Sequence, residues 1–244
     1  GNLTDSLEYR IYAQNSFNGI SDGASNIEGY DLRGIRQKGG NAKAEDLAVT
    51  GRLDWKPENG VMIGGSFWSG EMGHGQEIFA HDDTDQTTPL GTPGIQTNLY
   101  EVHAEYKRGG WWLRGLAAQA QIDDADLLSE SLADDNGNVQ GHNVGETMTG
   151  WYAEVGYDIM PWIADRPEQA LYPWVRHTDL ETQASMPKGY EADPANDRTI
   201  TEVGLHYMPH PNVVVKVDYR DFRSEADDST NNQDELQLGI GYNF

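Results

Sequence analysis

The chain ends in Asp234-Glu235-Leu236-Gln237-Leu238-Gly239-Ile240-Gly241-Tyr242-Asn243-Phe244, a stretch in which apolar and polar residues alternate. Because successive side chains of a strand point to opposite faces, the apolar residues of this stretch would share one face. A last strand with an aromatic final residue on its apolar face is typical of β-barrels in bacterial outer membranes. We interpret Tyr242 and Phe244 as an assembly signal of such a barrel, although a soluble sheet can alternate in the same way.

The composition is compatible with a membrane barrel and restricts other classes. The 244 residues suffice for one large β domain or two small ones, and the absence of cysteine excludes disulfide bonds and cysteine metal sites. No apolar run approaches the ~20 residues of a membrane-spanning helix. The mean hydropathy of −0.69 would suit a soluble protein. A barrel tolerates this value, because only every second residue of its strands faces lipid.

The chain is strongly acidic, with a net charge of −23. This charge argues against nucleic acid as a partner, because phosphate contacts need clustered lysine and arginine. Acidic loops in water or a high-salt habitat would both explain it. The first residues lack the basic and apolar regions of a signal peptide, so we expect a mature form or a fragment, with a cytoplasmic protein left open.

Alternation of period two recurs along the whole chain and predicts ten strands. Their ranges are 5–16, 44–56, 61–70, 96–107, 111–122, 147–160, 170–182, 198–208, 212–223 and 234–244. The connections alternate between short ones (57–60, 108–110, 161–169, 209–211) and long ones (17–43, 71–95, 123–146, 183–197, 224–233). This order predicts an all-β, transmembrane, antiparallel up-and-down β-barrel with short periplasmic turns, forming a single domain over residues 1–244.

The predicted strands carry apolar residues on one face and charged residues on the other. A soluble barrel or sandwich would alternate too, with its apolar face inside. The aromatic residues favour the membrane, because several of them lie near the short turns and would form a girdle at the periplasmic interface. These residues are Trp55, Tyr106, Trp111, Tyr157, Trp162, Tyr207 and Tyr242.

Four stretches resemble proteobacterial porins related to the phosphate-selective porins. They are residues 32–39 (LRGIRQKG), 41–49 (NAKAEDLAV), 192–199 (ADPANDRT) and 209–216 (PHPNVVVK). The resemblance is distributed over nearly the whole chain, and no single motif is diagnostic. It implies a barrel of about sixteen strands, of which this chain would be the C-terminal part, and a homotrimer. A complete barrel of ten strands is the alternative.

Charged residues on the second face are expected to line a polar, water-filled lumen. The candidates are Arg10, Arg52, Arg114, Arg176, Arg220, Glu101, Glu105, Glu154 and Asp218. The glycine-rich loop 17–43 adds Arg33, Arg36 and Lys38, which would favour anions if the loop folds inward to a constriction. Binding of lipopolysaccharide phosphates or simple solvation would explain these three residues equally well.

The long loops 71–95 and 123–146 favour the opposite selectivity, because they carry twelve acidic residues and no lysine or arginine. Their mouth residues include Asp82, Asp83, Asp85, Asp123, Asp124 and Asp126, which would attract cations. Residues 134–138 superficially resemble a calcium loop, but Val139 stands where that motif needs glycine. We therefore expect no metal site, no cofactor and no catalytic residue.

The sequence thus predicts a bacterial outer-membrane porin that passes ions or small hydrophilic solutes by diffusion. Its expected partners are membrane lipid, lipopolysaccharide and the solutes themselves. A barrel enzyme of the protease or lipase type, using residues such as His81 or His142, and a non-conducting structural or adhesion barrel are the alternatives.

Overall fold

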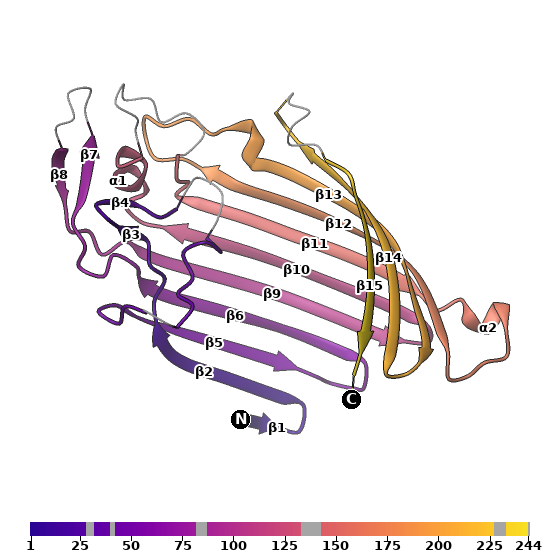
Figure 1. Cartoon of the computed structure of the whole chain (residues 1–244). Helices are drawn as coiled ribbons and strands as arrows, with labels where there is room; N and C mark the ends of the chain where they lie inside the picture. Colours follow the sequence, from indigo (N-terminus) through magenta and orange to yellow (C-terminus); the bar gives the residue numbers. More distant parts are fainter. Residues whose placement is uncertain (28–31, 40–41, 82–86, 133–142, 227–232, 244) are drawn as a thin grey trace.

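The chain folds into one antiparallel sheet of eleven strands that lie almost entirely in sequence order. The computed structural model describes residues 1–27, 32–39, 42–81, 87–132, 143–226 and 233–243. The strands of the sheet are β1 (Asn2–Thr4), β2 (Leu7–Asn15), β5 (Leu47–Trp55), β6 (Val61–Glu71), β9 (Gln96–Arg108), β10 (Trp111–Ile122), β11 (Thr147–Tyr157), β12 (Ala170–Ser185), β13 (Asp197–His210), β14 (Val213–Ser224) and β15 (Glu235–Tyr242). The sheet is strongly curved, so that β14 and β15 pass in front of the middle strands in Figure 1.

All ten predicted strands are confirmed. The largest boundary differences are three residues, where strands begin at Leu47 instead of 44 or end at Tyr157 instead of 160 and at Ser185 instead of 182. The eleventh strand, β1, was not predicted, because three residues are too short to establish an alternation. The strand ending at Tyr157 is shorter than predicted because helix α2 (Met160–Ile163) begins there, with Pro161 in its first turn.

The three longest connections join β2 to β5, β6 to β9 and β10 to β11, and they lie at one end of the sheet, here called the long-connection end, as Figure 1 shows. The predicted sorting by length is present only in part, because the connection through α2 at the opposite end is longer than those from β12 to β13 and from β14 to β15. At this opposite end, Gly109 and Gly110 join β9 to β10 in a two-residue turn with φ values of 58° and 86°, which glycine adopts without strain. The other end holds the hairpins β3 (Ile20–Ser21) with β4 (Ala24–Ser25) and β7 (Ile78–His81) with β8 (Thr87–Gly91). It also holds helix α1 (Ala125–Glu130) and the 3-10 turn η1 (Pro194–Asn196).

The buried apolar side chains gather at the long-connection end, where residues of the connections pack against the inner-face ends of β10 and β11. This loop core consists of Ile20, Ile27, Ile35, Met72, Ile78, Ile95, Ala120, Ile122, Ala125, Leu128, Val144 and Met148. The buried His74, in the connection between β6 and β9, is hydrogen-bonded to the connection between β2 and β5. Its Nε2 donates to the Phe17 carbonyl over 2.8 Å, and its Nδ1 accepts from the Asp46 amide over 3.2 Å. Among the described residues, no helix has the length and apolarity to cross a membrane.

One face of the sheet, here called the outer face, exposes large apolar side chains. The exposed fraction is 46% for Leu53 and reaches 81% for Ile240. The register aligns these residues into continuous rows across the strands, for example Leu113, Val155, Val175, Val203, Tyr219 and Leu236. In a soluble sandwich a face of this composition would be covered by a second layer. No such layer covers it in the part of the chain that the structure describes.

Aromatic residues concentrate on this face where the short turns lie. Trp111 and Tyr157 meet edge to face with ring centroids 4.9 Å apart, and Trp162 lies 5.1 Å from Tyr157. Trp55 closes β5 at the same end, and the Tyr207 hydroxyl donates to Gln169 Oε1 over 3.0 Å. The predicted aromatic band is therefore present in position, while its contact with a membrane interface stays a prediction.

Replacing Leu128 by alanine tests whether the loop core is a separate packing unit. Leu128 is fully buried in that core, and such a truncation costs about 2–5 kcal/mol. We expect Leu128→Ala to speed proteolysis within the long connections while the far-ultraviolet circular dichroism of the sheet persists. Ile163→Ala, on the exposed helix α2, is the matched control and should leave cleavage unchanged. Loss of the sheet signal in Leu128→Ala would show that the two parts are not independent.

Candidate functional site

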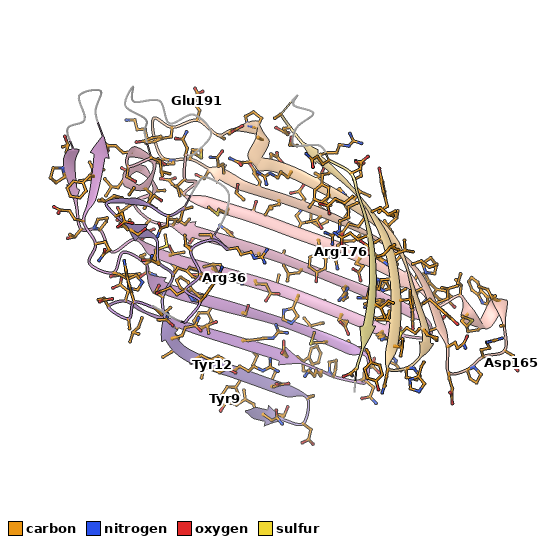
Figure 2. The ribbon with its side chains drawn as sticks, in the orientation of Figure 1. Tyr9, Tyr12, Arg36, Asp165, Arg176 and Glu191 are labelled. Carbon is orange, nitrogen blue, oxygen red and sulfur yellow. The ribbon has the colours of Figure 1, made fainter. Side chains whose placement is uncertain are left out.

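The face opposite the exposed apolar side chains, here called the inner face, carries the charged residues of the strands. In β10, for example, Arg114 lies on the inner face while its neighbour Leu113 lies on the outer face, because side chains alternate along a strand. Figure 2 labels Arg176, whose strand β12 lies among the middle strands of the curved sheet. The candidate site is therefore a surface built from many strands and not a single pocket.

A row of alternating acidic and basic residues crosses seven neighbouring strands of the inner face. The register pairs each member with the next one on the adjacent strand, from β9 through β15. We call this row the charge ladder, and it runs Glu105, Arg114, Glu154, Arg176, Glu202, Arg220 and Glu235. Opposite charges that face each other across strands stabilise a sheet, whereas like charges in the same positions destabilise it.

The centre of the charge ladder is tightly paired. Glu154 accepts from Arg114 Nη2 over 2.7 Å and from Arg176 Nη2 over 2.6 Å. Glu202 lies 2.7 Å from Arg220 Nε and 3.4 Å from Arg176 Nη1. The Glu154 side chain is only 2% exposed, so its charge depends on these two guanidinium groups in place of water.

Aromatic rings hold the guanidinium groups of the ladder in place. The Arg114 guanidinium carbon lies 4.6 Å from the centroid of the Trp112 ring, and that of Arg176 lies 4.7 Å from the Tyr152 ring. These contacts join a cation to the negative face of a ring and leave the N–H groups free to reach carboxylates. The arginines are thus fixed in orientation as well as in position.

A second charged cluster lies on β5, β6 and β9. Arg52 donates to Asp54 over 2.8 Å, and His103 bridges Asp54 Oδ1 (2.9 Å) and Glu101 Oε1 (2.6 Å) through its two ring nitrogens. The Ser66 hydroxyl donates to the other oxygen of Glu101 over 2.8 Å. At the edge of the sheet, Arg10 and Lys56 both pair with Glu8.

The structure brings all nine predicted lumen residues to the inner face. Arg10, Arg52, Arg114, Arg176, Arg220, Glu101, Glu105, Glu154 and Asp218 occupy it, and Glu and Arg residues pair across neighbouring strands. Whether this face lines a pore stays a prediction.

The predicted basic loop residues lie away from the ladder. Arg33, Arg36 and Lys38 are exposed in the connection between β4 and β5, where Arg36 Nε donates to the Arg33 carbonyl over 3.2 Å. In Figure 2 the segment that carries Arg36 passes in front of the sheet. Leu32, in the same segment, lines a cavity together with inner-face residues, so this part of the loop does turn inward.

The acidic connection around α1 remains open to solvent where it is described. Asp123, Asp124 and Asp126 are exposed at the start of this helix. Burial raises the pKa of Tyr190, and the carboxylates of Glu130 and Asp126 raise it further. Glu130 and Asp126 of the connection around α1 therefore act on Tyr190 of the connection between β12 and β13. Several predicted positions lie outside the described residues, namely Asp82, Asp83, Asp85, residues 134–138, His142 and Phe244. Tyr242 lies exposed on the outer face.

Sequence reasoning missed an apolar region of the inner face next to the ladder. Leu116, Met148 and Leu180 belong to the inner face but carry no charge, and they line a cavity of about 550 Å³ with Trp68 and Leu99. The sequence contained one signal of this region. Leu116, Ala118 and Ala120 follow Arg114 at every second position of β10 and therefore share its face. This strand is therefore apolar on part of both faces.

No protein-family model matches the chain. A protein of Aquifex aeolicus (strain VF5), described as an uncharacterized protein, is 30% identical over 228 residues, which make up 92% of this chain and 48% of that protein. The chain therefore spans about half the length of the curated relative that it matches.

The charge ladder predicts unequal costs for removing different arginines. Arg176→Gln leaves the buried Glu154 and Glu202 carboxylates with one guanidinium partner each, so we expect a loss of about 1–2 kcal/mol in the free energy of unfolding. Arg10→Gln is the matched control, because its partner Glu8 is more exposed, and should cost less than about 0.5 kcal/mol. Denaturant titration of the purified protein, followed by tryptophan fluorescence, compares the two variants. Equal losses would refute a special role for the ladder.

Proposed function

We propose that this chain forms part of an outer-membrane β-barrel whose inner face lines a watery path for ions and small hydrophilic solutes. The observation that carries the proposal is the division of one sheet into an exposed apolar outer face and an inner face crossed by the charge ladder. Transport through such a path is passive diffusion. Water and the balanced charges of the wall replace part of the hydration shell of a passing solute.

The outer face favours lipid as its surroundings. Exposure of apolar surface to water costs roughly 25 cal/mol for each Å², and monomeric soluble proteins rarely leave large continuous patches uncovered. Rows such as Val155, Val175 and Val203 would instead contact acyl chains. The aromatic band with Trp55, Trp111 and Trp162 would then lie at the headgroups on the short-turn side.

The free edges of the sheet support closure into a barrel. Strand β15 pairs with β14 alone, and the three-residue β1 covers only the beginning of β2 within the described sheet. In a bilayer, each unpaired backbone group costs several kcal/mol, so a spanning sheet must pair its edges. Bacterial single-chain barrels have even strand numbers. Eleven strands and a relative of about twice this length therefore favour closure on further strands of the same polypeptide over closure of this sheet on itself.

Selectivity would arise at two levels in this barrel. The charge ladder alternates in sign, so that ions of either charge find partners along the wall. The exposed Asp123, Asp124 and Asp126 at the long-connection end would raise the local concentration of cations. We therefore propose a weakly cation-preferring porin. The homotrimer and the contacts with lipid and lipopolysaccharide that the porin resemblance implies remain part of the proposal.

Single-channel conductance of the detergent-purified full-length protein in a planar bilayer tests this function. Under a salt gradient, we expect conductance steps whose reversal potential indicates a preference for cations. The triple variant Asp123→Asn, Asp124→Asn and Asp126→Asn should shift this potential toward anions, because the mouth loses three negative charges. Three matched Asp→Asn or Glu→Gln changes at the other end (Asp165, Glu168 and Glu58) should shift it less.

Two outcomes would refute the proposal. The first is a folded protein that gives no conductance steps, which would favour an enzyme or a structural barrel. The second is a protein that stays dispersed in buffer without detergent, which would place the exposed outer face against another protein layer.

A further inference from the structure

The edge strand β15 has the features of a strand that accepts a partner. Within the described sheet it pairs with β14 alone, from Glu235 to Tyr242, and this pairing contains no register shift. Its sequence, ELQLGIGY, contains neither proline nor lysine. Proteins commonly use these two residues, or a bulge, to stop a free edge from pairing with another strand. The edge of β15 is therefore regular and unprotected.

The outer-face side chains of β15 are exposed as if one neighbouring strand were missing. Leu238 and Ile240 are 80% and 81% exposed, whereas Val217 and Val215, which lie opposite them on β14, are 37% and 40% exposed. The four residues are apolar and share one face, but β14 has a neighbour on both sides. A strand beside β15 would continue the outer face if it carried apolar residues next to Leu238 and Ile240.

The charge ladder shows what the same strand needs on the inner face. Glu154 lies between two guanidinium groups, those of Arg114 and Arg176, at 2.7 and 2.6 Å. Glu202 likewise lies between Arg176, at 3.4 Å, and Arg220, at 2.7 Å. The side chains of these two carboxylates are only 2% and 6% exposed. Each inner acid of the ladder is thus paired from both neighbouring strands.

Glu235, the last member of the ladder, has a guanidinium group on one side only. Arg220 Nη1 lies 3.9 Å from its carboxylate, and the same arginine is already paired with Glu202. The Gln237 amide donates to Glu235 Oε2 over 3.0 Å, and the Glu235 side chain is 50% exposed. A second guanidinium group can reach this carboxylate from a strand on the open side of β15. Arginine suits this position because its planar fork matches a carboxylate.

Strand β2, at the other edge of the sheet, is partly covered by the segment that precedes it. Strand β1 pairs with the beginning of β2, and Gly1 exchanges two backbone hydrogen bonds of 2.8 Å with Tyr9. Pairing of all eight residues of β15 with β2 would displace this segment. A strand from elsewhere meets no such obstacle.

We propose that β15 pairs with a further antiparallel strand of the same polypeptide, which carries an arginine opposite Glu235 and apolar residues beside Leu238 and Ile240. The arginine gives Glu235 its second guanidinium group and extends the charge ladder onto that strand. The inference rests on the proposed porin function, because a sheet that spans a bilayer must pair its edges. It deepens that function by stating the chemistry of the strand that closes this edge. The Aquifex relative, of which the match covers 48%, is long enough to contain such a strand.

Photo-crosslinking from position 239 tests the proposal with the full-length protein in lipid nanodiscs. Benzoylphenylalanine replaces Gly239, where an added side chain meets open space on the inner face. We expect the crosslink, mapped by mass spectrometry, to join β15 to a strand of the same molecule outside residues 1–244, with an arginine opposite Glu235. Benzoylphenylalanine in place of Ala118, in the middle of the sheet, is the matched control and should reach no strand outside residues 1–244.

Each other crosslinking result would overturn the proposal. A crosslink to β2 would show that this sheet closes on itself, and a crosslink between two molecules would make the edge a subunit contact. Crosslinks confined to β14 would show an unpaired edge. A crosslinked strand without an arginine opposite Glu235 would refute the extension of the ladder.

A charge swap tests the pair itself. Glu235→Arg would face both Arg220 and the proposed arginine, so the ratio of folded to unfolded protein at a fixed urea concentration should fall about 2- to 5-fold. Changing the crosslinked arginine to glutamate in the same molecule should restore most of this ratio. Gln237→Arg, at the next inner-face position, is the matched control and should gain less from the same second change. Absence of rescue would overturn the proposal, because repulsion from Arg220 alone does not respond to that change.

Conductance of the crosslinked preparations separates this inference from the porin function. A conducting protein whose β15 is crosslinked elsewhere refutes the proposed partner strand alone. The expected crosslink in a protein that does not conduct supports the partner strand and refutes the porin.

Discussion

The Glu154 carboxylate, held between the guanidinium groups of Arg114 and Arg176, is the interaction on which the arrangement of the sheet depends. It joins three neighbouring strands on the inner face, where little water reaches it. A slip of one residue in either pairing would move this charge to the outer face and leave both arginines without it. The same slip would turn Val155 inward. The charge ladder and the apolar rows therefore specify one register together, each from its own side of the sheet.

This constraint also explains where the molecule keeps its conventional core. The outer face is apolar but uncovered, and the inner face is largely charged except near the long connections, so only that end of the inner face takes part in a packed interior. The buried apolar residues instead come from the long connections, together with the ends of β10 and β11. Packing of the loop core then holds Phe17 against Trp68 and Leu32 beside the inner face, so the loop core helps to shape the cavity.

The strands could be predicted from the sequence because each of the ten alternates over many residues, and the turns because glycine and proline mark them. The nine lumen candidates were predictable for the same reason, since phase within a strand decides the face. Their exact partners were not, because register shifts such as the one between Thr147 and Thr149 move the pairing without a local signal. The hairpins β3–β4 and β7–β8 and the helix α1 are too short for periodicity to reveal. The cavity depends on Trp68, Leu116, Met148 and Leu180, which meet only after the five strands from β6 to β12 have aligned.

The separation of the loop core from the sheet has a consequence for the order of folding. Each main strand pairs with the next main strand along the chain, so the sheet grows by closing one connection at a time, and the entropy cost of closure rises only slowly with the length of a connection. The loop core joins residues as distant as Ile20 and Val144, and its contacts require the hairpins between them to be in place already. We therefore expect the sheet to assemble before the loop core. In that order, the inner face would be complete before the long connections cover one end of it.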